Sequence, residues 1–274
     1  MAVIAMTREM GTLGKDIAFG LAETLDLRIV HHELVEHDLA QRLGIQESAV
    51  HHYLEGSASM LERWRIDKKK LSRFTAVEIL ELVQEGNVVI RGWGATALLK
   101  DIPHVLRVRV CAPMPFREKV MMERLGINDA ATVRREIERS DSAHARTITS
   151  FFGIDWENPI HYNMVINTEQ VPTAASVRAL RLLTDDDVFR ETVATRMALA
   201  DKLVEWRIRM ALAERDGNTS TARLEVDVKN GYVILTGTAM HASVASIAEQ
   251  IVRDIPGVDD VETRIMVIRD FGGI

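Results

Sequence analysis

Residues 3–25, VIAMTREMGTLGKDIAFGLAETL, join a short apolar run to an amphipathic helical pattern through a turn that carries two glycines. The run Val3–Met6 is typical of a buried strand, whereas apolar residues recur at the spacing of one helix face over Ile17–Leu25. Gly11 and Gly14 therefore lie at a strand-to-helix junction. Because the N-terminus of a helix favours anions, this turn is a candidate phosphate site.

Up to about residue 183 the chain alternates short apolar runs with longer helical patterns, which predicts an α/β fold with a parallel sheet flanked by helices. Strands that are buried on both faces are expected to be short and almost continuously apolar. Five runs fit that description: Val3–Met6, Arg28–Val30, Val88–Ile90, Val105–Val110 and Met164–Ile166. We therefore predict a five-stranded parallel sheet.

A second pattern begins near residue 185, so we place a domain boundary between residues 1–184 and residues 185–274. Thr184 is expected to cap a helix whose first turn holds three aspartates, which the helix dipole favours. Two alternating runs then meet at Asn230 and Gly231, a strong signal for a β-hairpin. A further helix and a closing strand complete a predicted small α/β unit.

The composition is that of a folded globular protein, with 47% hydrophobic and 27% charged residues. The formal net charge of −6 gives no general attraction to nucleic acid, and we expect no nucleic-acid partner. Cys111 is the one cysteine in the sequence, which excludes an intrachain disulfide. The sequence has no apolar run of the roughly 18 residues that a transmembrane helix needs, so we expect a cytoplasmic protein without a transmembrane segment.

The glycine turn departs from the strict Walker A pattern, GxxxxGK[ST], in which backbone N–H groups hold phosphates and the lysine reaches the outer oxygens. Aligning Gly14 and Lys15 with that pattern puts Glu9 in place of the first glycine and Asp16 in place of the hydroxyl residue. Two interpretations stay open at this point. The turn is either a phosphate loop with altered residues or an ordinary tight turn beside a solvated lysine.

A second group of charged side chains lies in residues 134–146, RREIERSDSAHAR. The pattern of this segment predicts a single helix. Arg139 and Arg146 are seven residues apart, about two helical turns, so both can point at one ligand. Arginines that close over phosphates suit phosphoryl transfer, because catalysis there depends on positioning and charge neutralisation. The alternative is a solvated helix face whose arginines pair with the neighbouring carboxylates.

Four blocks of sequence, in order, resemble the cytidylate kinase-like proteins, which are P-loop relatives of bacterial cytidylate kinase, over roughly residues 2–183. The blocks are TREMGTLGKDIAFGLAETLDLRIVHHEL, VIRGWGATALL, RVRVCAPMPFREKVMMERLGI and RSDSAHARTITSFFGIDWENPIHYNMVINT. The resemblance implies a P-loop kinase-type fold and the use of ATP and Mg²⁺.

Carried over by position, the resemblance implies that one set of loop residues holds the phosphates of ATP. This set is Gly11, Thr12, Leu13, Gly14, Lys15 and Asp16. The resemblance also places Asp16 near Mg²⁺ and makes Lys15, Arg139 and Arg146 the catalytic residues, with the two arginines closing on the donor and acceptor phosphates.

On the acceptor side, the resemblance implicates His32, Arg91 and Trp93. His32 follows the second predicted strand, where the acceptor nucleotide lies in kinases of this class. Trp93 stands where true cytidylate kinases have a phosphate-binding arginine, and Arg91 lies two residues earlier on the same face of the strand.

Residues 222–268, ARLEVDVKNGYVILTGTAMHASVASIAEQIVRDIPGVDDVETRIMVI, resemble a BON domain, which implies a protein or lipid partner for the tail. Together the resemblances imply transfer of the γ-phosphoryl group of Mg-ATP to a nucleoside monophosphate or a related acceptor. One alternative is a catalytically degenerate nucleotide sensor that signals through the BON-like domain. A scaffold in which neither part binds a small molecule is the third hypothesis.

Overall fold

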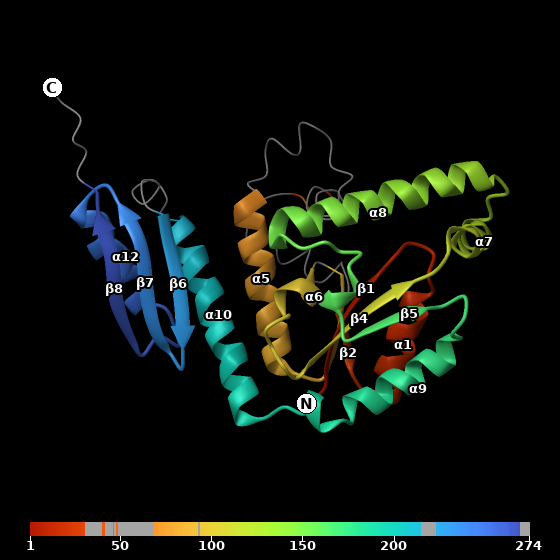
Figure 1. Cartoon of the computed structure of the whole chain (residues 1–274), viewed down its shortest axis with the longest axis horizontal. Coiled ribbons are helices and arrows are strands. Elements are labelled where there is room, and N and C mark those ends of the chain that lie inside the picture. The colour runs from red at the N-terminus through yellow and green to blue at the C-terminus, as the bar shows by residue number, and fades with distance from the viewer. Residues whose placement is uncertain are drawn as a thin grey trace. The chain divides into compact units, whose positions relative to one another are not determined.

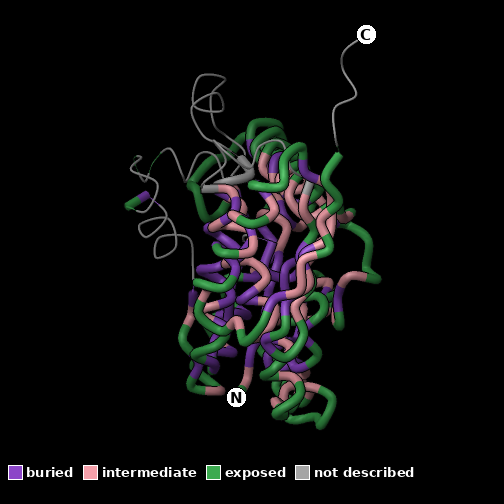
Figure 2. Tube along the Cα trace, turned by 90° about the vertical axis from the view of Figure 1, so that its left-hand side faces the viewer, coloured by how far each residue is buried: buried purple, intermediate pink, exposed green. Residues whose placement is uncertain are grey.

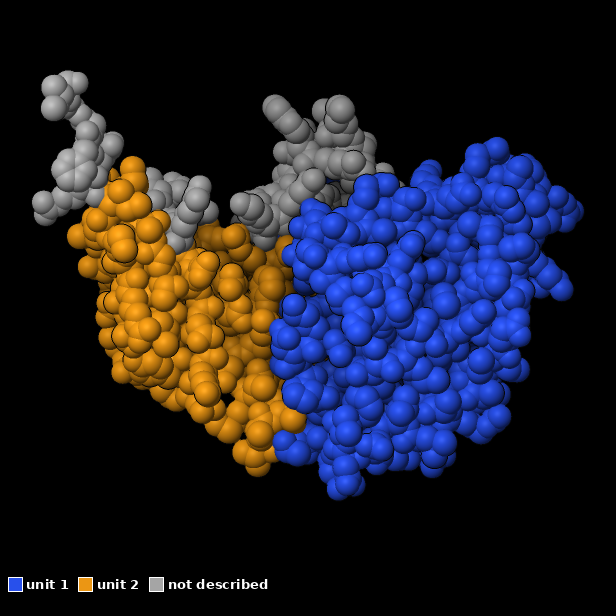
Figure 3. Space-filling model, in the orientation of Figure 1, with its two compact units in different colours: residues 1–71, 85–192 blue, residues 72–84, 193–274 orange. Residues whose placement is uncertain are grey.

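The computed structural model describes residues 1–30, 40, 41, 46, 48, 68–92, 94–214 and 223–268. The chain divides into two compact units, which are coloured separately in Figure 3. Unit 1 comprises Met1–Leu71 and Glu85–Thr192, and unit 2 comprises Ser72–Gln84 and Val193–Ile274. Each unit is described by itself below.

Unit 1 is built on a parallel sheet of five strands in the order β2-β3-β1-β4-β5 (Figure 1). The strands are β1 (Val3–Arg8), β2 (Arg28–Val30), β3 (Val88–Arg91), β4 (Val105–Cys111) and β5 (Met164–Asn167). Strand β1 is central, and its Met6 lies opposite Arg91 of β3 and Val108 of β4. The five strands predicted from apolar runs are thus confirmed.

Helices occur in both units. The helices of unit 1 are α1 (Gly14–Leu25), α6 (Ala95–Leu98), α7 (Met114–Leu125), α8 (Ala130–Phe152) and α9 (Thr173–Thr184), with the 3-10 turns η1 (Pro159–His161) and η2 (Asp187–Phe189). Helix α5 (Lys68–Glu85) contributes to both units. The helices of unit 2 are α10 (Val193–Glu214) and α12 (Ala242–Arg253).

Helix α1 forms where the sequence predicts it because its apolar face is buried. Ile17 and Leu21 of this face are fully buried against the sheet, together with Leu180 of α9. The helices approach closely at Gly20, where a Cβ would lie 2.9 Å from Cγ2 of Val177. Figure 2 shows the buried positions of the chain in purple.

The prediction that a helix begins at Thr184 is wrong. Thr184 is the last residue of α9, and its hydroxyl donates to the Arg181 carbonyl (2.7 Å). The carboxylate of Asp186 accepts the N–H of Val188 (3.0 Å) and so caps the 3-10 turn η2. An aspartate can cap any such turn, so the acidic run does not mark the start of α10, which begins at Val193.

Unit 2 contains a three-stranded sheet in the order β6-β7-β8, with β6 (Arg223–Lys229), β7 (Tyr232–Ala239) and β8 (Asp260–Val267). Strands β6 and β7 form the predicted antiparallel hairpin, whereas β8 runs parallel to β7. At the turn, Asn230 and Gly231 have φ angles of 52° and 75°. Their N–H groups donate to the Asp201 carboxylate of α10 (2.8 and 3.0 Å), which ties the hairpin to that helix.

Candidate functional site

The loop between β1 and α1 is closely surrounded by its neighbours. Gly11 has a φ of 83°, and a Cβ at this position would lie 2.8 Å from the carbonyl oxygen of Arg117. A Cβ at Gly14 would lie 2.9 Å from Cβ of Arg8. Glycine is therefore needed at both positions, because no side chain fits there without displacing the backbone or the strand.

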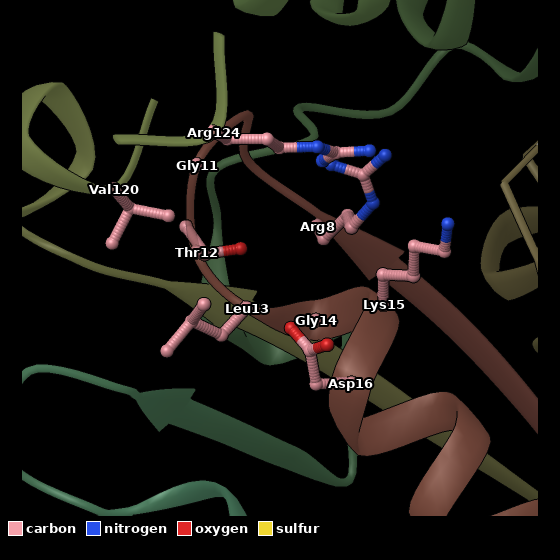
Figure 4. Close-up of a pocket in the computed structure, with 9 residues that line it drawn as sticks. All are labelled: Arg8, Gly11, Thr12, Leu13, Gly14, Lys15, Asp16, Val120 and Arg124. Atoms are coloured by element: carbon pink, nitrogen blue, oxygen red, sulfur yellow. The ribbon is translucent and has the colours of Figure 1, made fainter. Parts of the chain in front are cut away.

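A pocket of about 190 Å³ opens at this loop (Figure 4). Its lining residues are Arg8, Gly11, Thr12, Leu13, Gly14, Lys15, Asp16, Val120 and Arg124. The Arg8 and Arg124 side chains converge on one side of the loop, and the Lys15 side chain extends on the same side (Figure 4). Three cations against one carboxylate make the lining positive, which favours an anion.

The chemistry of this pocket fits a phosphate chain. The first turn of α1 directs backbone N–H groups to the site, and guanidinium groups bind phosphate through paired hydrogen bonds. Its volume is below the roughly 300 Å³ of a typical small-molecule pocket, so it suits the phosphates rather than a whole nucleotide. The pocket lining thus has the charge and the size to hold a phosphate group.

A magnesium ion bound here would depend on the ligand's own oxygens. Asp16 is the one carboxylate in the pocket lining. Within the part of the chain that the structure describes, no group of three or more His, Cys, Asp or Glu side chains could hold a metal. Mg²⁺ is commonly held by one or two carboxylates together with phosphate oxygens, and Asp16 fits that arrangement.

The structure brings the predicted loop residues together but places the predicted arginines elsewhere. The six loop residues named for ATP, from Gly11 to Asp16, all line the pocket. Arg139 and Arg146 are exposed on α8 and are absent from the lining. Arg139 Nη1 lies 3.8 Å from the Glu136 carboxylate, and the Arg139 side chain is 67% exposed.

Arg91, predicted on the acceptor side, ends β3 and is 9% exposed. Its Nε and Nη1 have no hydrogen-bond partner among the described residues. Burial lowers the pKa of Arg91 and nearby Arg124 lowers it further, whereas Asp16 raises it. Two charged residues of the pocket lining, Arg124 and Asp16, thus influence the pKa of Arg91. The other two predicted acceptor residues, His32 and Trp93, lie outside the described residues.

Sequence reasoning missed two pocket cations, Arg8 and Arg124. Arg8 is the last residue of β1, so its position at the carboxyl end of a central strand was an available signal. Arg124 lies in the last turn of α7, more than 100 residues along the chain from the loop, and no motif marks it. Its role depends on how α7 packs beside the loop.

Comparison with known proteins places this unit in a family. The model of the cytidylate kinase-like family matches residues 3–170. The chain belongs to the cytidylate kinase-like family. A cytidylate kinase of Sulfurisphaera tokodaii is 26% identical over 170 residues, covering 62% of this chain and 87% of that protein. A cytidylate kinase of Pyrobaculum aerophilum is 24% identical over 181 residues, covering 65% and 90% of the two chains.

The BON domain model matches residues 200–269, and so includes most of unit 2. Among solved structures, an uncharacterized protein from Eubacterium ventriosum aligns with a TM-score of 0.54 at 18% identity. The alignment covers 68% of this chain and 99% of that protein, which supports the fold of the cytidylate kinase-like region. Both predicted resemblances are confirmed. No helix among the described residues is long and apolar enough to cross a membrane.

A buried set of four charges lies behind the loop of the cytidylate kinase-like region. The Glu9 carboxylate accepts from Arg109 Nη2 (2.7 Å) and lies 3.3 Å from Arg117 Nη1. Arg117 also pairs with Asp141 of α8 (2.5 Å). Each of the two arginine side chains is at most 6% exposed, and each carboxylate is at most 18% exposed. Two cations and two anions leave the set neutral overall, unlike the pocket lining.

The same family region holds a second polar chain between β1 and α8. The hydroxyl of Thr7 accepts the indole N–H of Trp156 (2.8 Å), so its own hydrogen is available for Nε2 of His144 (3.2 Å). His144 also meets Trp156 edge to face, with ring centroids 4.7 Å apart. Burial, with a smaller contribution from Arg8 and Arg109, lowers the pKa of His144 to about 4. The imidazole is thus neutral and structural.

Proposed function

We propose that this protein binds Mg-ATP at the loop between β1 and α1 and transfers the γ-phosphoryl group to a nucleoside monophosphate or a related acceptor. The observation that carries the proposal is the positive pocket lined by Arg8, Lys15 and Arg124 at the start of α1 in a cytidylate kinase-like chain. The proposal includes a cytoplasmic location and a protein or lipid partner for the BON domain.

The loop residues and the charged residues of the pocket each have a role in this proposal. The backbone N–H groups of Gly11–Gly14 and the Lys15 ammonium group hold the donor phosphates, while Asp16 contributes a ligand to Mg²⁺, which neutralises charge on the phosphate oxygens. Arg8 and Arg124 stabilise negative charge that develops during transfer.

The acceptor side is assigned to Arg91 and, from the sequence resemblance alone, to Trp93 and His32, which lie outside the described residues. The Nε and Nη1 atoms of Arg91, which have no hydrogen-bond partner among the described residues, support this, because a buried guanidinium gains most from an anionic ligand. Arg139 and Arg146, which do not line the pocket, have no role in this proposal.

A nucleotide sensor is the second candidate function. Asp16 favours it, because this carboxylate occupies the place of the hydroxyl that holds Mg²⁺ in a Walker A loop and adds a negative charge beside the phosphates. Phosphate binding is common to both candidates, whereas turnover belongs to the enzyme. Steady ADP release with a panel of nucleoside monophosphates would therefore exclude a pure sensor.

The site assignment is tested with Lys15→Ala, measured as the Kd for Mg-ATP by calorimetry. A lost charge-assisted contact predicts binding weaker by about 10- to 100-fold. Lys100→Ala is the matched control, because Lys100 is an exposed lysine outside the pocket lining. Unchanged ATP binding by the Lys15 variant would show that the nucleotide site lies elsewhere.

A further inference from the structure

Helix α8 contacts the phosphate loop through Asp141. One oxygen of this carboxylate, Oδ1, accepts the backbone N–H of Met10 in the loop (3.1 Å). The other, Oδ2, pairs with Arg117 of α7, which lies 3.3 Å from the Glu9 carboxylate. A single side chain of α8 therefore holds two consecutive loop residues, one directly and the other through Arg117.

The orientation of α8 separates Asp141 from the exposed arginines of the same helix. With 3.6 residues per turn, Arg139 and Arg146 lie roughly 160° and 140° around the helix from Asp141. His144, about 60° from Asp141, also faces β1, where its Nε2 lies 3.2 Å from the Thr7 hydroxyl. The face of α8 turned toward the loop thus carries Asp141 and His144, while the two arginines face away.

Contacts at the C-terminal end of α8 keep this orientation. Phe152 packs directly on Gly94, where a Cβ would overlap its ring. Ile148 is buried with Trp156 and Tyr162 in a separate apolar cluster. Because α8 is held by packing at one end, the loop contact of Asp141 is backed by a fixed element rather than by an exposed side chain.

We propose that Asp141 is a positioning residue for phosphate binding: it holds the Met10 N–H inward, so that the following amides of Gly11–Gly14 stay directed at the pocket. The inference rests on the proposed function, since it concerns how the same loop binds phosphate. A loop rich in glycine loses much conformational freedom when a ligand orders it, and a prior anchor reduces that cost.

The negative charge of Asp141 and its proposed positioning role predict opposite changes in anion affinity when this carboxylate is removed. The carboxylate is negative and close to a phosphate pocket, so its loss by itself should strengthen the binding of an anion. Loss of order in the loop should weaken anion binding. Weaker anion binding by the variant therefore cannot come from the change in charge, and reports the positioning effect.

The test compares wild-type protein with Asp141→Ala and Asp141→Asn, using calorimetry with inorganic pyrophosphate and with Mg-ATP. Asp141→Ala is expected to weaken pyrophosphate binding by about tenfold, the value of one lost hydrogen bond. Asp141→Asn should lose less than about threefold, because its amide oxygen still accepts the Met10 N–H. Glu138→Ala is the control, since it removes one exposed carboxylate of the same helix and should change the Kd by less than about twofold.

The outcomes separate this inference from the proposed function. If wild-type protein binds neither pyrophosphate nor Mg-ATP, both are wrong. If it binds them and Asp141→Ala binds as tightly or more tightly, the positioning role alone is wrong. Should Asp141→Ala fail to fold, amide hydrogen exchange of Met10 in ligand-free wild-type protein decides. Slow exchange supports the anchor, and exchange as fast as that of an exposed amide overturns it.

Discussion

Two pairs of arginines lie beside the same loop and differ in the charges around them. Arg8 and Arg124 line the pocket, where together with Lys15 they outnumber Asp16. Arg109 and Arg117 lie behind the loop, where Glu9 and Asp141 balance them. The comparison shows that carboxylates decide the role of an arginine here. Arginines paired with buried carboxylates hold the loop in place, whereas the pocket lining carries a net positive charge.

The largest expected effect comes from breaking the buried set with Arg109→Ala. Arg109 donates to Glu9 (2.7 Å) and to the Trp156 carbonyl (2.8 Å) and stacks on the Trp156 ring at 4.2 Å. Its loss leaves Oε1 of the largely buried Glu9 carboxylate without its arginine, while Oε2 keeps Arg117 Nη1 and the Ala112 N–H, each at 3.3 Å. The free energy of unfolding should therefore fall by about 3–5 kcal/mol. Urea unfolding measures this change.

The matched variant is Arg124→Ala, because it removes the same kind of side chain from the pair that lines the pocket, and Arg124 is exposed. Its free energy of unfolding should stay within about 0.5 kcal/mol of wild type. Similar destabilisation by both variants would remove the distinction between the two pairs of arginines.

A smaller effect is expected at the other anchor of α8, with Gly94→Ala. Gly94 has a φ of 70° and lies against the Phe152 ring. Backbone strain and the clash together should lower the free energy of unfolding by about 3 kcal/mol. Gly153→Ala provides the control, because Gly153 has nearly the same φ of 66° but open space around its Cβ position.

The control variant should lose about 1 kcal/mol, the cost of the left-handed conformation alone. Thermal unfolding measures the stability loss of each alanine variant, and the difference between the two losses gives the contribution of the clash with Phe152. Equal losses would mean that this contact does not fix α8.

The pH dependence of stability gives the third test, through His144. The pKa of its folded form is about 4, below the ordinary value of 6.5, so the unfolded chain takes up a proton first as the pH falls. The contribution of His144 is therefore complete above about pH 7 and is lost between about pH 6.5 and 4. Because the side chain is half-buried, we expect a loss of about 2 kcal/mol.

Urea unfolding of wild type and His144→Asn at several pH values measures this loss. Asp141 acts in the opposite direction, since burial raises its pKa, but it is present in both proteins. The variant should show a flatter profile between pH 4 and 7. Parallel profiles would show that His144 ionises as easily in the folded protein as in the unfolded chain.

Local patterns predicted most of the scaffold correctly. The five buried strands, the glycine junction and the Asn230–Gly231 hairpin each depend on neighbouring residues and on backbone conformation, which sequence spacing records. The predicted start of α10 was wrong because an aspartate can cap a 3-10 turn as well as an α-helix. Near residue 185 the acidic run caps a 3-10 turn instead.

The sequence by itself determined that a glycine-bearing turn joins the first strand to a helix and that Gly11, Gly14 and Lys15 lie at this junction. Tertiary structure alone decided which arginines share the pocket, because Arg124 reaches the loop through the packing of α7 and not through any motif. It also decided that Asp141, rather than Arg139 or Arg146, faces the loop. Spacing defines the faces of a helix, but apolar contacts such as those of Ile148 and Phe152 choose which face of α8 turns inward.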